Sequence, residues 1–166
     1  MAVAMFATAP SHSDSKPAMY AELSEHARSL FENERDATAN SANLSALLYQ
    51  VMPDLNWAGF YWMKGGELVL GAFQGKPACV RIALGRGVCG TAARTRATII
   101  VPDVNRFPGH IACDSASKSE LVVPLLQGAK LLGVMDLDSP KLARFDDEDA
   151  RGLESLAKLL VESSDL

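Results

Sequence analysis

The sequence has no long apolar run and no excess of positive charge. Its apolar stretches are all shorter than the roughly 18 residues that a membrane-spanning helix requires. Lysine and arginine number 16 against 20 aspartates and glutamates, which gives a formal net charge of −4 at pH 7. Nucleic acids and anionic membranes attract basic proteins, and an acidic chain lacks that attraction. We therefore expect neither nucleic acid nor a membrane as a partner.

Cysteine is also scarce. The chain has three, an odd number, and its apolar start "MAVAMFATAP" lacks the basic segment of a secretory signal peptide. A framework of structural disulfides is therefore not expected, and we predict a cytoplasmic protein with reduced thiols. Cys79, Cys89, Cys113 and His110 are candidate metal ligands, but no two cysteines form the C-x2-4-C pair of a zinc knuckle. We predict no bound metal.

The overall composition is typical of one globular domain. The 166 residues are 48% hydrophobic and 22% charged, in a chain long enough to bury a core without a disulfide or a metal. The polar segment "SHSDSKP" follows the apolar start and is typical of a flexible tail. We therefore predict a flexible tail over residues 1–17 and one folded domain over residues 18–166.

Hydrophobic spacing predicts helices at both ends of the domain and strands between them. Apolar residues recur at helical spacing in residues 18–34, 38–52 and 145–160. Asp146 is placed to cap the last of these helices. Apolar hairpins are predicted over residues 57–73 and 121–138, a short buried strand over 98–101, and a short helix opened by the glycine turn within 85–97. This order predicts an α+β fold, with a central, mainly antiparallel sheet flanked by N- and C-terminal helices.

Three acids are predicted to converge near the second hairpin. Asp136 and Asp138 stand two apart on one strand and therefore share a face. If the turn is the three residues 128–130, Glu120 lies opposite Asp138. A two-residue turn would move Glu120 to the other face, unless a bulge at Pro124 restores the register. Converging like charges need a metal, another bound cation or a shared proton; the alternative is that these acids are solvated strand ends.

The cysteines occur in two kinds of surroundings. Cys113, in "ACDSASKS", and Cys79, in "GKPACVRI", are flanked by polar and basic residues, which favours exposed thiolates. Two such cysteines allow a nucleophile and a resolving thiol to react through a disulfide. Cys89 lies among small apolar residues and is predicted to pack into a helix face. His110 is either a base for Cys113 or a loop histidine bonded to backbone, and Trp57 is either hairpin core or one wall of an apolar ligand pocket.

The segments "WAGFYW", "LVLGAFQGKPACVRIALGRGVCGTAA", "VPDVNRFPGHIACDSASKSELVVPL" and "LLGVMDLDSP" closely resemble the free methionine-(R)-sulfoxide reductases. These are stand-alone enzymes built on the GAF fold, and the resemblance runs from about residue 18 to 162. It implies a single GAF catalytic domain, a homodimer and an oxidoreductase active in oxidative stress. It also implies that no cofactor is bound and that thioredoxin is the external reductant.

The resemblance also implies roles for the candidate residues. Cys113 would attack the sulfoxide sulfur and become a sulfenic acid, and Cys79 would then close a disulfide that thioredoxin reduces. Cys89 would not be required for this cycle. The remaining candidates would surround the substrate: Trp57, Glu120, Asp136 and Asp138.

The resemblance agrees with the interpretation of the acid cluster. Free methionine sulfoxide carries an ammonium group, which would supply the cation that the cluster needs. A crowded carboxyl with a raised pKa is a suitable acid for the leaving oxygen, and either Glu120 or Asp138 fits that role. The alternative function is a non-catalytic GAF module that senses a small molecule or the redox state.

Overall fold

The computed structural model of the chain describes residues 15–110 and 114–166. Most of the predicted tail lies outside these residues and stays a prediction. Cys113, the predicted nucleophile, also lies outside the described residues. None of the described helices is long and apolar enough to cross a membrane.

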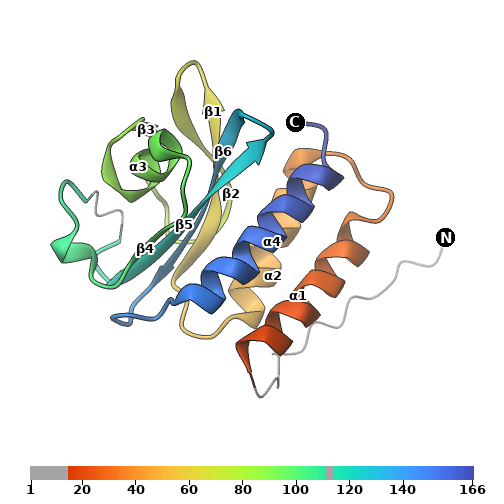
Figure 1. Cartoon of the computed structure of the whole chain (residues 1–166), viewed down its shortest axis with the longest axis horizontal. Coiled ribbons are helices and arrows are strands. Elements are labelled where there is room, and N and C mark those ends of the chain that lie inside the picture. The colour runs from red at the N-terminus through yellow and green to blue at the C-terminus, as the bar shows by residue number, and fades with distance from the viewer. Residues whose placement is uncertain (1–14, 111–113) are drawn as a thin grey trace.

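The described residues form one antiparallel sheet and four α-helices (Figure 1). The helices are α1 (Lys16–Phe31), α2 (Ala37–Val51), α3 (Gly87–Thr95) and α4 (Asp147–Ser163), with one 3-10 turn, η1 (Val104–Arg106). The strands are β1 (Trp57–Lys64), β2 (Glu67–Gly75), β3 (Arg81–Ala83), β4 (Ile99–Val101), β5 (Ser119–Gln127) and β6 (Lys130–Ser139). The sheet order is β3-β2-β1-β6-β5-β4, and every neighbouring pair is antiparallel. The predicted α+β class is confirmed.

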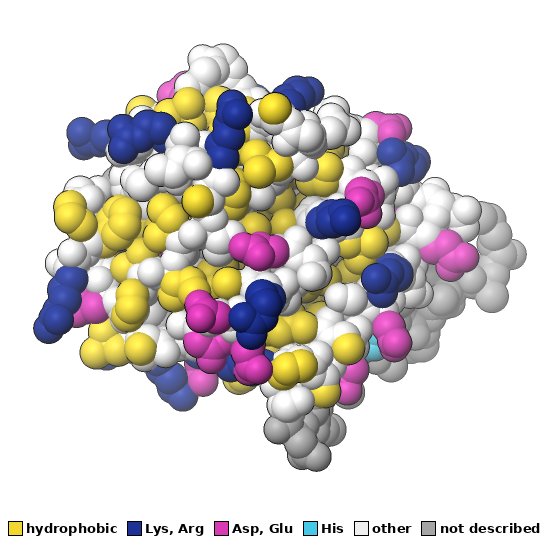
Figure 2. Space-filling model, in the orientation of Figure 1, with side chains coloured by type: hydrophobic (Ala, Val, Ile, Leu, Met, Phe, Trp, Pro, Cys, Tyr) yellow, Lys and Arg dark blue, Asp and Glu magenta, His cyan; other side chains and the backbone are white. Residues whose placement is uncertain are grey.

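Helices α2 and α4 cover one face of the sheet, and α1 packs on both of them. The apolar stripes that predicted these helices form the main core, with Leu44 and Leu48 from α2 and Leu153, Leu156 and Leu160 from α4. Helix α4 begins as predicted, because the side chain of its N-cap residue accepts hydrogen bonds from the first turn. Figure 2 shows acidic side chains gathered where α4 begins, at the end of the helix whose dipole favours negative charge.

The other face of the sheet carries α3 and the loops that flank it (Figure 1). A smaller apolar cluster forms there from residues of several strands, α3 and η1, and includes Trp57, Tyr61, Ile82, Cys89 and Val104. The two clusters divide the interior into a large core under α2 and α4 and a small one under α3. A pocket lies beside the small cluster, so this face carries the candidate site.

The turn between β5 and β6 has two residues, and not the three that would place Glu120 opposite Asp138 without a bulge. Gln127 pairs with Lys130, so the turn contains only Gly128 and Ala129. Gly128 adopts a φ of 59°, which a tight two-residue hairpin turn requires. Of the two turn lengths that the sequence left open, the structure therefore has the shorter.

A β-bulge compensates for the shorter turn. Leu125 pairs with Gly133, and the register shifts between this pair and the turn, so Leu132 is an extra residue on β6. Beyond the bulge the register is the one that a three-residue turn would have given, and Glu120 pairs with Asp138. The bulge lies next to Pro124, where the sequence indicated that one could restore the register.

Candidate active site

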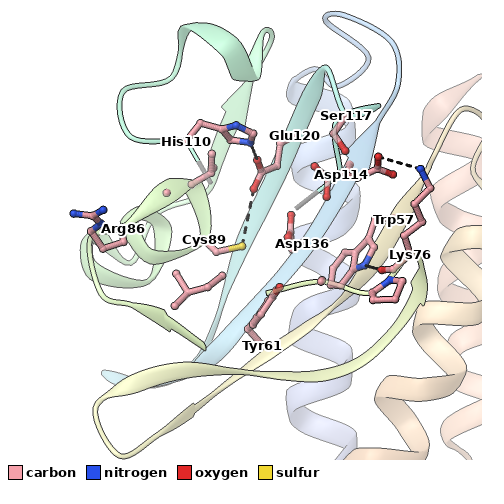
Figure 3. Close-up of a pocket in the computed structure, with 16 residues that line it drawn as sticks. Trp57, Tyr61, Lys76, Arg86, Cys89, His110, Asp114, Ser117, Glu120 and Asp136 are labelled. Atoms are coloured by element: carbon pink, nitrogen blue, oxygen red, sulfur yellow. Dashed lines mark hydrogen bonds and ion pairs between the residues drawn. The ribbon is translucent and has the colours of Figure 1, made fainter. Parts of the chain in front are cut away.

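A pocket opens between the sheet, the first turn of α3 and the loops before β3 and β5 (Figure 3). Its floor consists of three acids from two neighbouring strands: Glu120 from β5, and Asp136 and Asp138 from β6. Glu120 and Asp136 are each only 6% exposed. The predicted convergence of these acids is therefore confirmed, and Glu120 and Asp136 are buried rather than solvated, while Asp138 is half-buried.

The acid floor is electrostatically strained. Burial raises the pKa of all three carboxyls well above the usual range, and the charges of neighbouring acids raise it further. A hydrogen bond with Ser117 opposes part of this rise in the pKa of Asp138, and a hydrogen bond with Asp136 opposes part of it at Glu120. The Oδ1 atom of Asp136 is buried and has no hydrogen-bond partner among the described residues. A buried acceptor of this kind calls for a donor, and a cationic donor would also relieve the repulsion.

Cys89 forms one side of the floor. Its Sγ lies 4.0 Å from Oε1 of Glu120, a contact that the sequence did not predict. Its burial in the small apolar cluster agrees with the prediction that it packs. Burial, followed by the charges of Asp136 and Glu120, raises the pKa of the thiol well above its usual value. Cys89 is therefore a protonated thiol at neutral pH and a poor nucleophile.

A cation could approach this group of residues. Donor atoms of Cys89, Glu120 and Asp136 lie within 4.8 Å of one another. One thiol and two carboxyls are fewer ligands than a closed structural metal site uses. The chemistry of the floor suits an organic ammonium group, which needs hydrogen-bond acceptors rather than a complete coordination shell.

An aromatic wall stands over the acids. Trp57, at the start of β1, pairs with Asp138 across the strands and is 4% exposed. Its ring stacks at 5.3 Å on Phe73 and at 5.9 Å on Tyr61, and its Nε1 donates to the carbonyl oxygen of Lys76 at 3.1 Å. Both earlier interpretations of Trp57 therefore hold, because it is part of the hairpin core and also lines the pocket.

The rim beside this wall is a hydrogen-bonded network that sequence reasoning missed. Oδ1 of Asp114 accepts from Lys76 Nζ at 3.2 Å and from the N–H of Ala116 at 2.9 Å. Asn56 donates to Oδ2 of Asp114 at 3.3 Å and to Ser117 Oγ at 3.0 Å. The N–H of Ala116, with Lys76 and Asn56, lowers the pKa of Asp114. The spacing Asp-x-Ala is a local signal for such a turn, but nothing in the sequence pairs it with Lys76 or Asn56.

The first turn of α3 closes another side of the pocket. The helix begins at Gly87 and has no side-chain cap, so its first backbone N–H groups are available to a ligand. Gly87, Val88 and Cys89 all line the pocket. A helix N-terminus with free N–H groups favours an anion such as a carboxylate.

The two cysteines with predicted redox roles differ in what the structure describes. Cys79 is half-buried in the loop between β2 and β3 and packs against the small apolar cluster. Lys76, Pro77 and Ala78, just before it in this loop, line the pocket. Cys113 is outside the described residues, directly before Asp114 in the sequence. The nucleophile and resolving roles of these cysteines stay predictions.

Comparison with known proteins gives matches over most of the chain. Residues 40–162 match the GAF domain family. The free methionine-R-sulfoxide reductase of Escherichia coli (strain K12) is 50% identical over 145 residues, which are 87% of this chain and 88% of that protein. The protein of the same name from Saccharomyces cerevisiae is 48% identical over 142 residues, 81% of this chain and 79% of that protein. An X-ray structure of free methionine-R-sulfoxide reductase from Neisseria meningitidis, in complex with its substrate, is 45% identical, with a TM-score of 0.90 and coverage of 96% of this chain and 95% of that chain.

Proposed function

Because this chain belongs to the free methionine-R-sulfoxide reductase family of GAF domains, we propose that it reduces the free amino acid methionine-(R)-sulfoxide to methionine. One observation of the site carries this proposal. The floor of the pocket is a set of buried acids in which Oδ1 of Asp136 has no partner among the described residues. It lies between an aromatic wall and the uncapped N-terminus of α3. These features suit a small zwitterion with an apolar sulfur-containing side chain.

Each group of the substrate has a matching feature. The ammonium group donates to Oδ1 of Asp136 and is attracted by the charge of Asp138. The carboxylate lies at the first N–H groups of α3, where the helix dipole favours an anion. The methyl-sulfur end packs against Trp57. A methionine sulfoxide within a polypeptide lacks both free charges, so the enzyme acts on the amino acid and not on proteins.

Glu120 is the acid of the sulfoxide step. It is buried, and burial raises its pKa well above the usual range, which favours the protonated form that a general acid needs. The pKa of Asp138 is raised as well, but a bound ammonium group favours its carboxylate form, and so does the hydrogen bond of Ser117. The Cys113 thiolate attacks the sulfoxide sulfur while Glu120 protonates the oxygen. The hydroxyl group then passes from the substrate sulfur to the sulfur of Cys113 as the new bond between the two sulfurs breaks, so methionine leaves and Cys113 becomes a sulfenic acid.

Cys79 completes the cycle as the resolving thiol. It attacks the sulfenic sulfur of Cys113, a disulfide forms, and the oxygen leaves as water. A dithiol protein, thioredoxin, then reduces this disulfide and is itself oxidised. The oxidising equivalents of the substrate therefore pass first to the two cysteines and then to thioredoxin.

The test is methionine release from each diastereomer of free methionine sulfoxide, with thioredoxin, its reductase and NADPH supplied. We expect turnover of the R form only, and none from Cys113→Ser in a folded state. If the reduced and folded wild-type protein released no methionine from either form, the proposal would fail, and the pocket would be a ligand-sensing site. Unchanged turnover in Cys113→Ser would remove Cys113 as the nucleophile.

A further inference from the structure

His110 is held at the pocket by a tight turn that its own sequence builds. In the run Phe107-Pro108-Gly109-His110, proline takes the second position and glycine the third, as in a type II turn. Gly109 has a φ of 73°, the left-handed conformation that the third position requires. The N–H of His110 donates to the carbonyl oxygen of Phe107 at 3.1 Å and closes the turn. The turn thereby fixes the backbone of His110 and the direction in which its side chain leaves it.

The base of this turn is attached to the strand that carries the acid. The N–H of Phe107 donates to the carbonyl oxygen of Val104 at 3.2 Å. The N–H of Val104 in turn donates to the carbonyl oxygen of Lys118 at 2.9 Å, two residues before Glu120. His110 and Glu120 therefore share a support, and their relative position does not depend on a long loop.

His110 and Glu120 meet in an almost buried pair (Figure 3). Nε2 of His110 lies 3.5 Å from Oε2 of Glu120, and the two side chains are 14% and 7% exposed. The other oxygen of Glu120 faces the protonated thiol of Cys89, and the other titratable groups near Glu120 in the described part of the chain are Asp136, Asp138 and Tyr61. Within residues 15–110 and 114–166, His110 is thus the basic side chain at Glu120. Burial lowers the pKa of His110, which keeps the imidazole neutral and able to accept a proton.

We propose that His110 is the positioning residue of Glu120, which orients the carboxyl group and exchanges its proton with solvent during the sulfoxide step. This inference rests on the proposed function. When Glu120 gives its proton to the sulfoxide oxygen, a carboxylate remains beside Asp136 and Asp138, where a further negative charge is costly. The imidazole, protonated from water at its exposed side, donates Nε2–H to Oε2 and then returns this proton to Glu120. Without His110 the new carboxylate lacks this donor, and the barrier rises.

The test measures methionine release in a single turnover of pre-reduced enzyme with no recycling reductant, so that thioredoxin does not enter the result. His110→Gln keeps a hydrogen-bond donor of similar size but cannot carry a proton, whereas His110→Phe lacks both abilities. We expect the rate constant to fall at least about tenfold in both variants, with unchanged affinity for methionine, because the role concerns the transition state. His26→Gln, on the exposed side of α1, is the matched control and keeps the wild-type rate.

A double substitution separates this role from simple packing. Glu120→Gln has no carboxyl to position, so adding His110→Gln to it should change the rate less than about twofold. Losses that multiply in the double variant would overturn the inference, as would a His110→Gln rate within about twofold of the wild type. If His110→Phe does not fold, His110→Gln alone decides. A wild-type protein that releases no methionine would instead overturn the proposed function.

Discussion

Asp136→Asn should make the protein more stable and at the same time prevent ligand binding. The side chain of Asp136 is 6% exposed, and burial followed by the charge of Glu120 raises the pKa of its carboxyl well above the usual value. The folded protein therefore retains a proton that the unfolded chain releases near pH 4. The free energy of unfolding must then fall as pH rises from about 4 towards the raised pKa. Asparagine does not titrate, so this part of the decline disappears in the variant.

The expected gain comes from removing the charge of a buried carboxyl whose Oδ1 atom has no partner among the described residues, because asparagine keeps an oxygen in this place but carries no charge. A buried acceptor without a partner costs about 1–3 kcal/mol, and more when it is charged. We expect the variant to gain about that amount at pH 8, which corresponds to roughly 2–4 °C in Tm for each kcal/mol in a chain of this size. Below about pH 4, where the carboxyl becomes protonated in the unfolded state as well as in the folded state, the gain should be much smaller.

The second measurement is the stabilisation of the folded protein by bound methionine. Ligand at about 100 times its Kd stabilises a folded protein by about 2.7 kcal/mol. The wild type should show this shift, whereas Asp136→Asn should show little, because the negative charge that attracts the ammonium group is gone. Urea unfolding at about pH 3 and pH 8, with and without methionine, measures both effects, and Asp147→Asn on the exposed start of α4 is the matched control. A variant that is no more stable than the wild type at pH 8, yet is stabilised equally by methionine, would refute the assignment of Asp136.

Three further substitutions test separate parts of the structure. Glu120→Gln should slow single-turnover methionine release by about 10²–10⁴-fold while the protein stays folded, since it removes the general acid; a near-normal rate would show that Glu120 is not the proton donor. Cys79→Ser should release about one methionine per chain and then stop with thioredoxin, because the sulfenic acid has no resolving thiol; sustained turnover, measured by NADPH oxidation, would remove Cys79 from the cycle. Gly152→Ala should destabilise the protein by about 1–3 kcal/mol despite the better helix propensity of alanine, because the new Cβ would overlap the ring of Tyr20, which is held by a 2.9 Å hydrogen bond to Asp149; a raised Tm would contradict this packing.

Regular elements could be predicted because their signals are local. The leucines of α4 recur at the spacing of one helical face, and Asp146 stands where a cap is needed, so both the helix and its start were predicted and confirmed. Gly152 shows the limit of such reasoning. As a helix residue it indicated only a slight weakness, whereas the structure shows that it makes room for Tyr20 from a different helix.

The acid cluster was predictable in part, unlike helix α4, which local signals predicted fully, and Gly152, whose role depends on tertiary packing. The alternation of side chains along β6 placed Asp136 and Asp138 on one face, and this required no structure. Whether Glu120 joined them depended on the register of the hairpin, and the sequence does not distinguish a three-residue turn from a two-residue turn with a bulge. Both give the same pairing of Glu120 with Asp138, so the convergence was predicted although the turn was not.

The sequence by itself therefore determined the helices, the hairpins, the shared face of the two aspartates and the family to which the chain belongs. Only the tertiary structure placed His110 against Glu120, Lys76 and Asn56 on Asp114, and the first turn of α3 over the acids. The reason is physical. Helical and strand periods follow from the geometry of neighbouring residues, whereas these contacts join residues of different loops, strands and helices, and only the packing of the sheet with α3 and the loops brings them together.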